Sequence, residues 1–193
     1  ATIRRQRQMC IRDSPNVFEC KAIVFEGPED YHKRLNDKKL KVNENSILII
    51  RGCGPVGYPG SAEVVNMQPP DRLLKKGIRH LPTLGDGRQS GTSESPSILH
   101  VSPESAVGGD LGIVKTYDKI KIDLNKRRVD LLISQAEFKK RRKNKKLFKP
   151  KNQTPWQEIF RNTVGQLDDG ACINSRGKYL DVSHTKGLPR DSH

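Results

Sequence analysis

The sequence predicts an α+β domain that is rich in β-structure and spans about residues 14–136. Short runs with the alternation or apolar content of strands outnumber runs with helical spacing. The clearest are two alternating apolar runs on either side of a polar turn, "NKRR", which is the pattern of a β-hairpin. A hydrophobic content of 33% in 193 residues is low but sufficient for one core, so we expect one principal domain.

The first part of the chain predicts a leader followed by a strand, a helix and a second strand. In residues 1–13 the apolar residues recur neither with the two-residue period of a strand nor with the 3.6-residue period of a helix. We therefore expect an unmatched leader that is disordered or foreign to the domain. "KAIVFEG" (21–27) predicts a strand. Residues 28–37 predict a short helix with proline and acids in its first turn, and "SILIIR" (46–51) predicts a buried strand.

The middle of the chain contains segments whose helical signals are weaker than those of residues 28–37. Residues 61–67 and 71–77 have helical composition and are separated by two prolines. A further helix is expected to start at "SPESAVGG", with Ser102 as its N-cap and Pro103 in its first position. The hairpin follows, with its apolar residues at Ile120, Ile122, Leu124, Val129, Leu131 and Ile133.

The C-terminal part predicts a basic connector over 137–153, and then a helix with an extended tail over 154–193. The helix is the best specified in the chain, because Thr154 is a good N-cap, proline follows it, and Gly165 marks the end. Its apolar residues recur at helical spacing, at Trp156, Ile159, Phe160 and Val164.

The charge of the chain is concentrated in one tract. The formal net charge is +14, and residues 139–151 hold nine Lys or Arg and no acid, which leaves +5 for the rest. Aromatic residues make up only 5% of the chain and no RNA-binding or helix-turn-helix pattern is present, so we do not expect a nucleic acid partner. No apolar run is long enough for a membrane span. The four cysteines lack metal spacing, which favours free thiols in a cytoplasmic protein.

Two motifs invite a ligand-binding interpretation. "GCGPVG" (52–57) matches GxGxxG after a strand, but the flanking prolines occupy positions where a dinucleotide-binding helix would begin, so we reject that interpretation. The loop "GDGRQSGTSESPS" (85–97) is neither a phosphate loop nor a nucleophile turn. Its hydroxyls lie just before a strand, so Ser90 and Thr92 are candidates for contacts with a polyhydroxylated or anionic ligand.

Several long segments resemble the C-terminal part of the dihydroxy-acid and sugar-acid dehydratases. They are "GPVGYPGSAEVVNMQPPDRLLKKGI", "LPTLGDGRQSGTSESPSILHVSPESAVGGDLGIVKTYDKIKIDLNKRRVDLLIS" and "TPWQEIFRNTVGQLDDGA…PRDSH". The resemblance runs from about Ser14 to His193, and "GRQSGTS" is more similar to the arabinonate and xylonate branch than to the branched-chain enzyme. It implies a β-barrel-like swivelling β/β/α domain with peripheral helices and a C-terminal helical extension.

The resemblance also implies a hydro-lyase that converts a sugar acid, a 2,3-dihydroxy acid, into a 2-keto-3-deoxy acid. By position, it makes Ser90 the catalytic base, Thr92 and His193 substrate-binding residues, and Glu63 a Mg²⁺ ligand. An iron–sulfur cluster of the 2Fe-2S type and most Mg²⁺ ligands would belong to an N-terminal domain that we expect to be missing here. None of the four cysteines matches a cluster-ligand motif.

Other functional interpretations stay open at this point. One is a fragment of the branched-chain dihydroxy-acid dehydratase. Another, from a different class, is a non-catalytic basic binding module. For the complete enzyme, the resemblance implies a homo-oligomer, a dimer or tetramer, and we expect this chain alone to be inactive.

Overall fold

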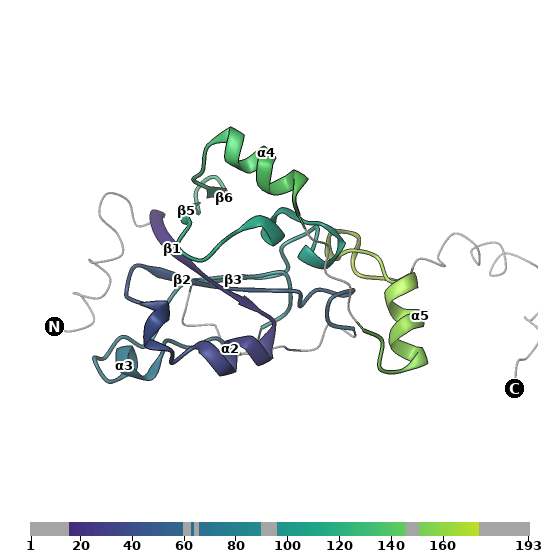
Figure 1. Ribbon diagram of the computed structural model, residues 1–193, viewed down its shortest axis with the longest axis horizontal. Coiled ribbons are helices and arrows are strands. Elements are labelled where there is room, and N and C mark those ends of the chain that lie inside the picture. Colours follow the sequence, from purple (N-terminus) through teal and green to yellow (C-terminus); the bar gives the residue numbers. More distant parts are fainter. Residues whose placement is uncertain (1–15, 60–62, 64–65, 90–95, 146–150, 174–193) are drawn as a thin grey trace, which may run out of the picture.

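The computed structural model describes residues 16–59, 63, 66–89, 96–145 and 151–173, and its centre is a mixed six-stranded sheet (Figure 1). The strand order is β4-β3-β2-β1-β5-β6. The strands are β1 (Val17–Glu26), β2 (Ser46–Arg51), β3 (Thr83–Gly85), β4 (Ser97–Ile98), β5 (Lys119–Asp123) and β6 (Arg128–Leu131). The sheet curls into half a barrel, which confirms the predicted α+β, β-rich, barrel-like class.

The sheet has a parallel half and an antiparallel half. Strands β1 to β4 pair in parallel, with Ile23 opposite Leu48 and Ile50 opposite Gly85. Strand β5 runs antiparallel to β1 and forms the predicted hairpin with β6. The parallel pairing places the carboxyl ends of β1, β2 and β3 at one edge, where the loops that follow these strands meet.

The core lies on both faces of β1 and β2, because successive side chains of a strand point to opposite faces. Phe25, Leu48 and Ile50 belong to a cluster on one face, and Val24 and Ile49 to a cluster on the other. A strand covered on both faces has no polar side, which explains the nearly continuous apolar run "SILII".

Helices are short and peripheral. They are α2 (Pro28–Arg34), α3 (Asp71–Leu74), α4 (Gln135–Lys143) and α5 (Pro155–Thr163). Figure 1 shows α5 beyond one end of the sheet, away from α3. Helix α5 begins as predicted, because the Thr154 hydroxyl accepts a hydrogen bond from the Gln157 amide. None of the helices in the described part of the chain has the length and apolar content to span a bilayer.

Two helix predictions are wrong. In the predicted segment 61–67, Glu63 forms an extended β-bridge and Asn66 and Met67 are irregular. The two prolines at 69 and 70 favour extended backbone just before them, and the Met67 side chain is buried in the core. Ser102 does not cap a helix: its hydroxyl donates to Asp168, and the short 3-10 turn starts only at Ser105.

The segment predicted as a basic connector begins inside helix α4, and one of its arginines fixes this helix to the domain. Arg141 forms ion pairs with Asp118 and Glu137 and donates to the carbonyl oxygen of Ile113. The Arg141 and Asp118 side chains are only 12% and 11% exposed, and the hydrogen bond to Asp118 raises the pKa of Arg141. By contrast, the Arg142 side chain is 65% exposed and its pairing atoms lie 3.5 Å from Asp110.

Replacing Arg141 by methionine should lower the free energy of unfolding by about 2 kcal/mol, because Asp118 would keep its charge in a largely buried position without its partner. Arg142→Met is the matched control and should cost less than about 0.5 kcal/mol, since exposed ion pairs contribute little. Urea denaturation of both variants measures the difference. Equal losses would contradict the anchoring role of Arg141.

Candidate functional site

The loops after β2 and β3 meet at one edge of the sheet and are joined by a buried carboxylate. Asp86 directly follows β3 and is fully buried. Its side chain accepts hydrogen bonds from the amides of Gly52 at 3.0 Å, Cys53 at 2.9 Å and Ser105 at 2.9 Å, and from the Ser105 hydroxyl at 2.5 Å. Asp86 therefore fixes the start of the glycine loop, residues 52–57, against the turn formed by residues 86–89.

A second buried carboxylate holds the other end of the glycine loop. Glu104 accepts hydrogen bonds from the amides of Val56 and Gly57, both at 2.9 Å, and is fully buried. A Cβ atom on Gly54 would lie 2.4 Å from the Glu104 carboxylate, so only glycine fits there. These amides bind carboxylates of the chain itself, which agrees with rejecting a dinucleotide-phosphate role for the glycine loop.

Residues of the C-terminal segment also form hydrogen bonds with Glu104 and with the glycine loop. Gln166 donates from its amide nitrogen to the Glu104 carboxylate and accepts from the Glu104 backbone amide, both at 2.9 Å. Arg161 of α5 donates to the Val56 carbonyl oxygen at 2.9 Å. Three separate stretches of sequence therefore determine the shape of the glycine loop.

The turn formed by residues 86–89 packs directly on the glycine loop. A Cβ atom on Gly87 would lie 2.4 Å from the Cys53 carbonyl oxygen, so the two backbones touch. Gln89 is only 6% exposed, and both polar atoms of its side chain lack a hydrogen-bond partner in the structure as described. The last residue of the turn, Gln89, therefore has a buried side-chain amide and directly precedes Ser90 in the sequence.

Glu63, the predicted Mg²⁺ ligand, lies beside this turn. It forms a parallel β-bridge with Arg88, and the Glu63 carboxylate is 3.1 Å from the Arg88 guanidinium. Both side chains are about half exposed. The structure therefore brings Glu63 to a residue two positions before Ser90. Ser90, Thr92 and His193 themselves lie outside the described residues.

The described residues fit one part of a magnesium site. Glu63 offers hard oxygen atoms, which Mg²⁺ prefers, and it already attracts a cationic group, Arg88. Within the described ranges, no three His, Cys, Asp or Glu side chains lie close enough to hold a metal by themselves. Glu63 is thus suited to act as one ligand of a shared site.

The described cysteines do not fit an iron–sulfur cluster. Cys53 and Cys172 are free thiols, as predicted, and no metal-binding group among the described residues includes a cysteine. Burial, and secondarily the charge of Asp86, raises the pKa of the Cys53 thiol. Cys53 is therefore a protonated thiol packed in the core, where its backbone amide and carbonyl shape the site.

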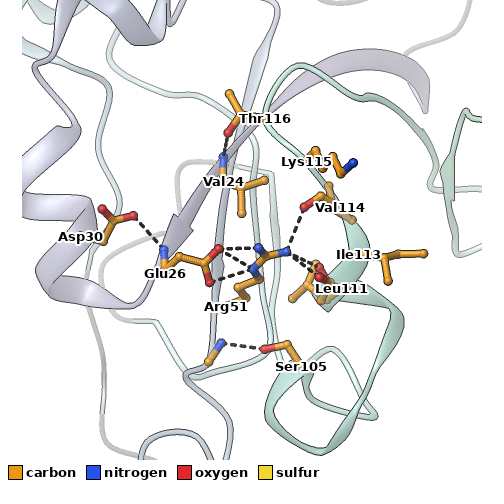
Figure 2. A network of polar contacts seen from close by, with 12 residues as sticks. Val24, Glu26, Asp30, Arg51, Ser105, Leu111, Ile113, Val114, Lys115 and Thr116 are labelled. Atoms are coloured by element: carbon orange, nitrogen blue, oxygen red, sulfur yellow. Dashed lines mark hydrogen bonds and ion pairs between the residues drawn. The ribbon is translucent and has the colours of Figure 1, made fainter. Parts of the chain in front are cut away.

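A basic crevice lies at the same edge of the sheet. Figure 2 shows Arg51, at the end of β2, between Glu26 and the segment 111–114. Arg51 forms an ion pair with Glu26 and donates to the carbonyl oxygens of Leu111, Gly112 and Val114 at 2.9–3.2 Å. A cavity of about 610 Å³ extends from here to α4. The arginines that line it are engaged in structural contacts.

Sequence reasoning did not find Asp86, Glu104 or Arg51 as determinants of this site. For Asp86 a signal existed, since an acid directly after a strand and between two glycines is suited to accept backbone hydrogen bonds. For Glu104 none existed, because the amides that it binds lie 47 and 48 positions away in the chain.

Residues 6–171 match the family model described as dihydroxy-acid/6-phosphogluconate dehydratase C-terminal. The match begins within the segment 1–13 that we expected to lie outside the similarity. A D-xylonate dehydratase from Caulobacter vibrioides is 54% identical over 189 residues, which is 98% of this chain and 31% of that protein.

Two further relatives carry related names. An L-arabinonate dehydratase from Rhizobium leguminosarum bv. trifolii is 38% identical over 180 residues, which is 92% of this chain and 30% of that protein. A dihydroxy-acid dehydratase from Thermodesulfovibrio yellowstonii is 38% identical over 168 residues, which is 86% of this chain and 30% of that protein. The chain spans about a third of the length of these relatives.

The family match covers most of the chain, and the glycine loop, the turn 86–89 and Glu63 lie within it. The class is therefore that of dehydratase C-terminal domains. The chain belongs to the family of dihydroxy-acid/6-phosphogluconate dehydratase C-terminal domains.

Proposed function

We propose that this chain is the C-terminal part of a cytoplasmic, homo-oligomeric hydro-lyase that dehydrates a sugar acid to a 2-keto-3-deoxy acid. The observation that carries the proposal is the bridge between Glu63 and Arg88, because it brings the predicted metal ligand to the turn that leads into the predicted base, Ser90. Similarity to relatives named for D-xylonate and L-arabinonate supports a sugar acid as substrate.

In the proposed reaction, the Ser90 oxygen takes the proton from C2 of the acid. The electron pair of the broken C–H bond forms the C2–C3 double bond while the C3 hydroxyl leaves, and with a proton it becomes water. The resulting enol converts to the 2-keto acid. A serine hydroxyl is a weak base at neutral pH, so its ionised form needs nearby positive charge.

The residues of this chain would contribute to the reaction by position and charge. Glu63 would hold a Mg²⁺ ion, which when bound supplies positive charge that lowers the pKa of neighbouring hydroxyls. Asp86 and Glu104 keep the glycine loop and the turn 86–89 in fixed register. Thr92 and His193 would contact the substrate. An iron–sulfur cluster would be held by another part of the enzyme, since the described cysteines do not fit it.

A chimeric enzyme tests the proposal. In this chimeric dehydratase, the chain replaces the matching part of the Caulobacter D-xylonate dehydratase, to which it is 54% identical. Keto-acid formation is measured with D-xylonate, L-arabinonate and a branched-chain dihydroxy acid. We expect turnover of a sugar acid at least about tenfold faster, as kcat/KM, than turnover of the branched-chain acid. A folded chimera with its cofactors that turns over none of these acids would contradict the proposal.

The alternative of a basic binding module gains no support from the described part of α4. Arg141 and Arg142 form ion pairs with Asp118 and Asp110, and the Lys145 ammonium donates to the carbonyl oxygens of Gly108 and Gly109. A polyanion would have to compete with these contacts. A branched-chain substrate is the second alternative, and the same substrate panel tests it.

A further inference from the structure

The Gln89 side chain is a polar group without an evident structural purpose. It is 94% buried, and neither the amide oxygen nor the amide nitrogen has a hydrogen-bond partner in the described structure. Leaving a polar group buried and unpaired is unfavourable, and such groups in native proteins call for a specific explanation. Apart from this side chain, the described residues contain no buried polar side-chain atom that lacks a partner.

The position of this amide is set by the end of β3. A methyl group added to Gly85 would lie 2.9 Å from both the Gln89 amide nitrogen and a methyl carbon of Ile50. The absence of a side chain at Gly85 therefore makes room for the amide, next to an apolar neighbour. A methionine side chain has a similar size and no polar amide, so it would suit this apolar neighbour better, yet the chain has glutamine at position 89.

In the sequence, Gln89 lies between the residue that pairs with Glu63 and the proposed base. Arg88, which precedes it, pairs with Glu63, and Ser90, which follows it, is the proposed base. A side chain at this position moves with the backbone that carries the base. The backbone of this turn is fixed through Asp86, whose side chain binds the amides of Gly52 and Cys53.

We propose that the Gln89 amide binds a hydroxyl group of the sugar acid and selects polyhydroxylated acids over apolar ones. An amide offers both donor and acceptor atoms, and a hydroxyl is the substrate group that uses both. The amide is shielded from solvent, so a substrate hydroxyl that binds it exchanges its hydrogen bonds with water for hydrogen bonds with the amide. An acid that lacks this hydroxyl would bind without giving the amide a hydrogen-bond partner. Sites of this kind discriminate strongly between substrates. This inference rests on the proposed function.

The first test measures stability and requires no turnover. Thermal unfolding of the 193-residue chain is compared with that of Gln89→Met, with the exposed Gln68→Met as the matched control. We expect the midpoint of Gln89→Met to equal or exceed that of the unaltered chain, because an unpaired amide is replaced by an apolar group of similar size. A midpoint lowered by about 4 °C or more would show that the amide has a partner in the resting protein, a buried water for example, and would overturn the inference.

The second test measures selectivity in the chimeric dehydratase. Gln89→Met should lower kcat/KM for the sugar acid by about 10- to 100-fold and leave kcat/KM for the branched-chain acid unchanged or raised. Gln68→Met should change neither value. Equal losses on both acids, or no loss on either, would overturn the inference. If the unaltered chimera turns over no acid, the proposed function fails, and the unfolding comparison still decides whether Gln89 is unpaired.

Discussion

Replacing Ser90 by alanine in the chimeric dehydratase should lower kcat for the sugar acid by about 10³-fold, because the proton on C2 would have no base positioned to accept it. KM should change little, since a small hydroxyl contributes less to binding than to the reaction. The measurement is steady-state keto-acid formation, together with exchange of the C2 proton with deuterium from the solvent. Both should be lost in the same variant.

Ser93→Ala is the control for this experiment, because it removes another hydroxyl from the same sequence loop without touching a residue that we assign a role. It should retain activity within about threefold. Turnover by Ser90→Ala within about tenfold of the unaltered chimera would reject Ser90 as the base. Loss of bound metal or cluster in Ser90→Ala would instead indicate a structural role, so metal content is measured alongside.

Replacing Asp86 by alanine should lower the free energy of unfolding by about 4 kcal/mol. The substitution leaves the buried amides of Cys53 and Ser105 without their acceptor, and each such group costs about 1–3 kcal/mol. The Gly52 amide loses Asp86 and keeps only the Ser105 hydroxyl as its acceptor. Asp86→Asn should be less harmful, because it retains one acceptor oxygen. Urea denaturation of the 193-residue chain measures both changes.

The exposed Asp169 provides the comparison for Asp86, and Asp169→Ala should stay within about 0.5 kcal/mol of the unaltered chain. In the chimeric dehydratase, Asp86→Asn should reduce kcat more than it raises KM, since it loosens the turn that carries the base rather than a substrate contact. An Asp86→Ala chain that unfolds at the same urea concentration as the unaltered chain would contradict the role that we assign to this carboxylate.

Some elements that local sequence specifies were predicted correctly. Strand β2 follows from its continuous apolar run, the β5–β6 hairpin from alternating apolar residues, and α5 from its N-cap, Thr154. Parallel pairing of β1 to β4 was not predicted, because the order of strands depends on contacts between distant segments. The continuous apolar run in β2 was the available signal, since strands buried on both faces are typical of parallel sheets.

The candidate site was predictable only in part. The resemblance supplied Glu63 and Ser90, and the structure describes the first of them beside the turn that leads to the second. The carboxylates that shape the site were not predicted, because Asp86 and Glu104 bind amides that are distant in the sequence, 33 positions away for Cys53 and 47 for Gly57. The unpaired state of Gln89 depends on three-dimensional burial, which no local pattern of residues reveals.

The ties between the C-terminal segment and the glycine loop limit how this protein can be engineered. Arg161 of helix α5 and Gln166, which follows the helix, bind residues 105 and 62 positions earlier in the chain, so this C-terminal segment is part of the domain structure. A shortened version ending before residue 154 would keep every named strand of the sheet but lose the contacts that hold the outer side of the glycine loop. Any minimal version of this domain must therefore retain the segment that contains Arg161 and Gln166.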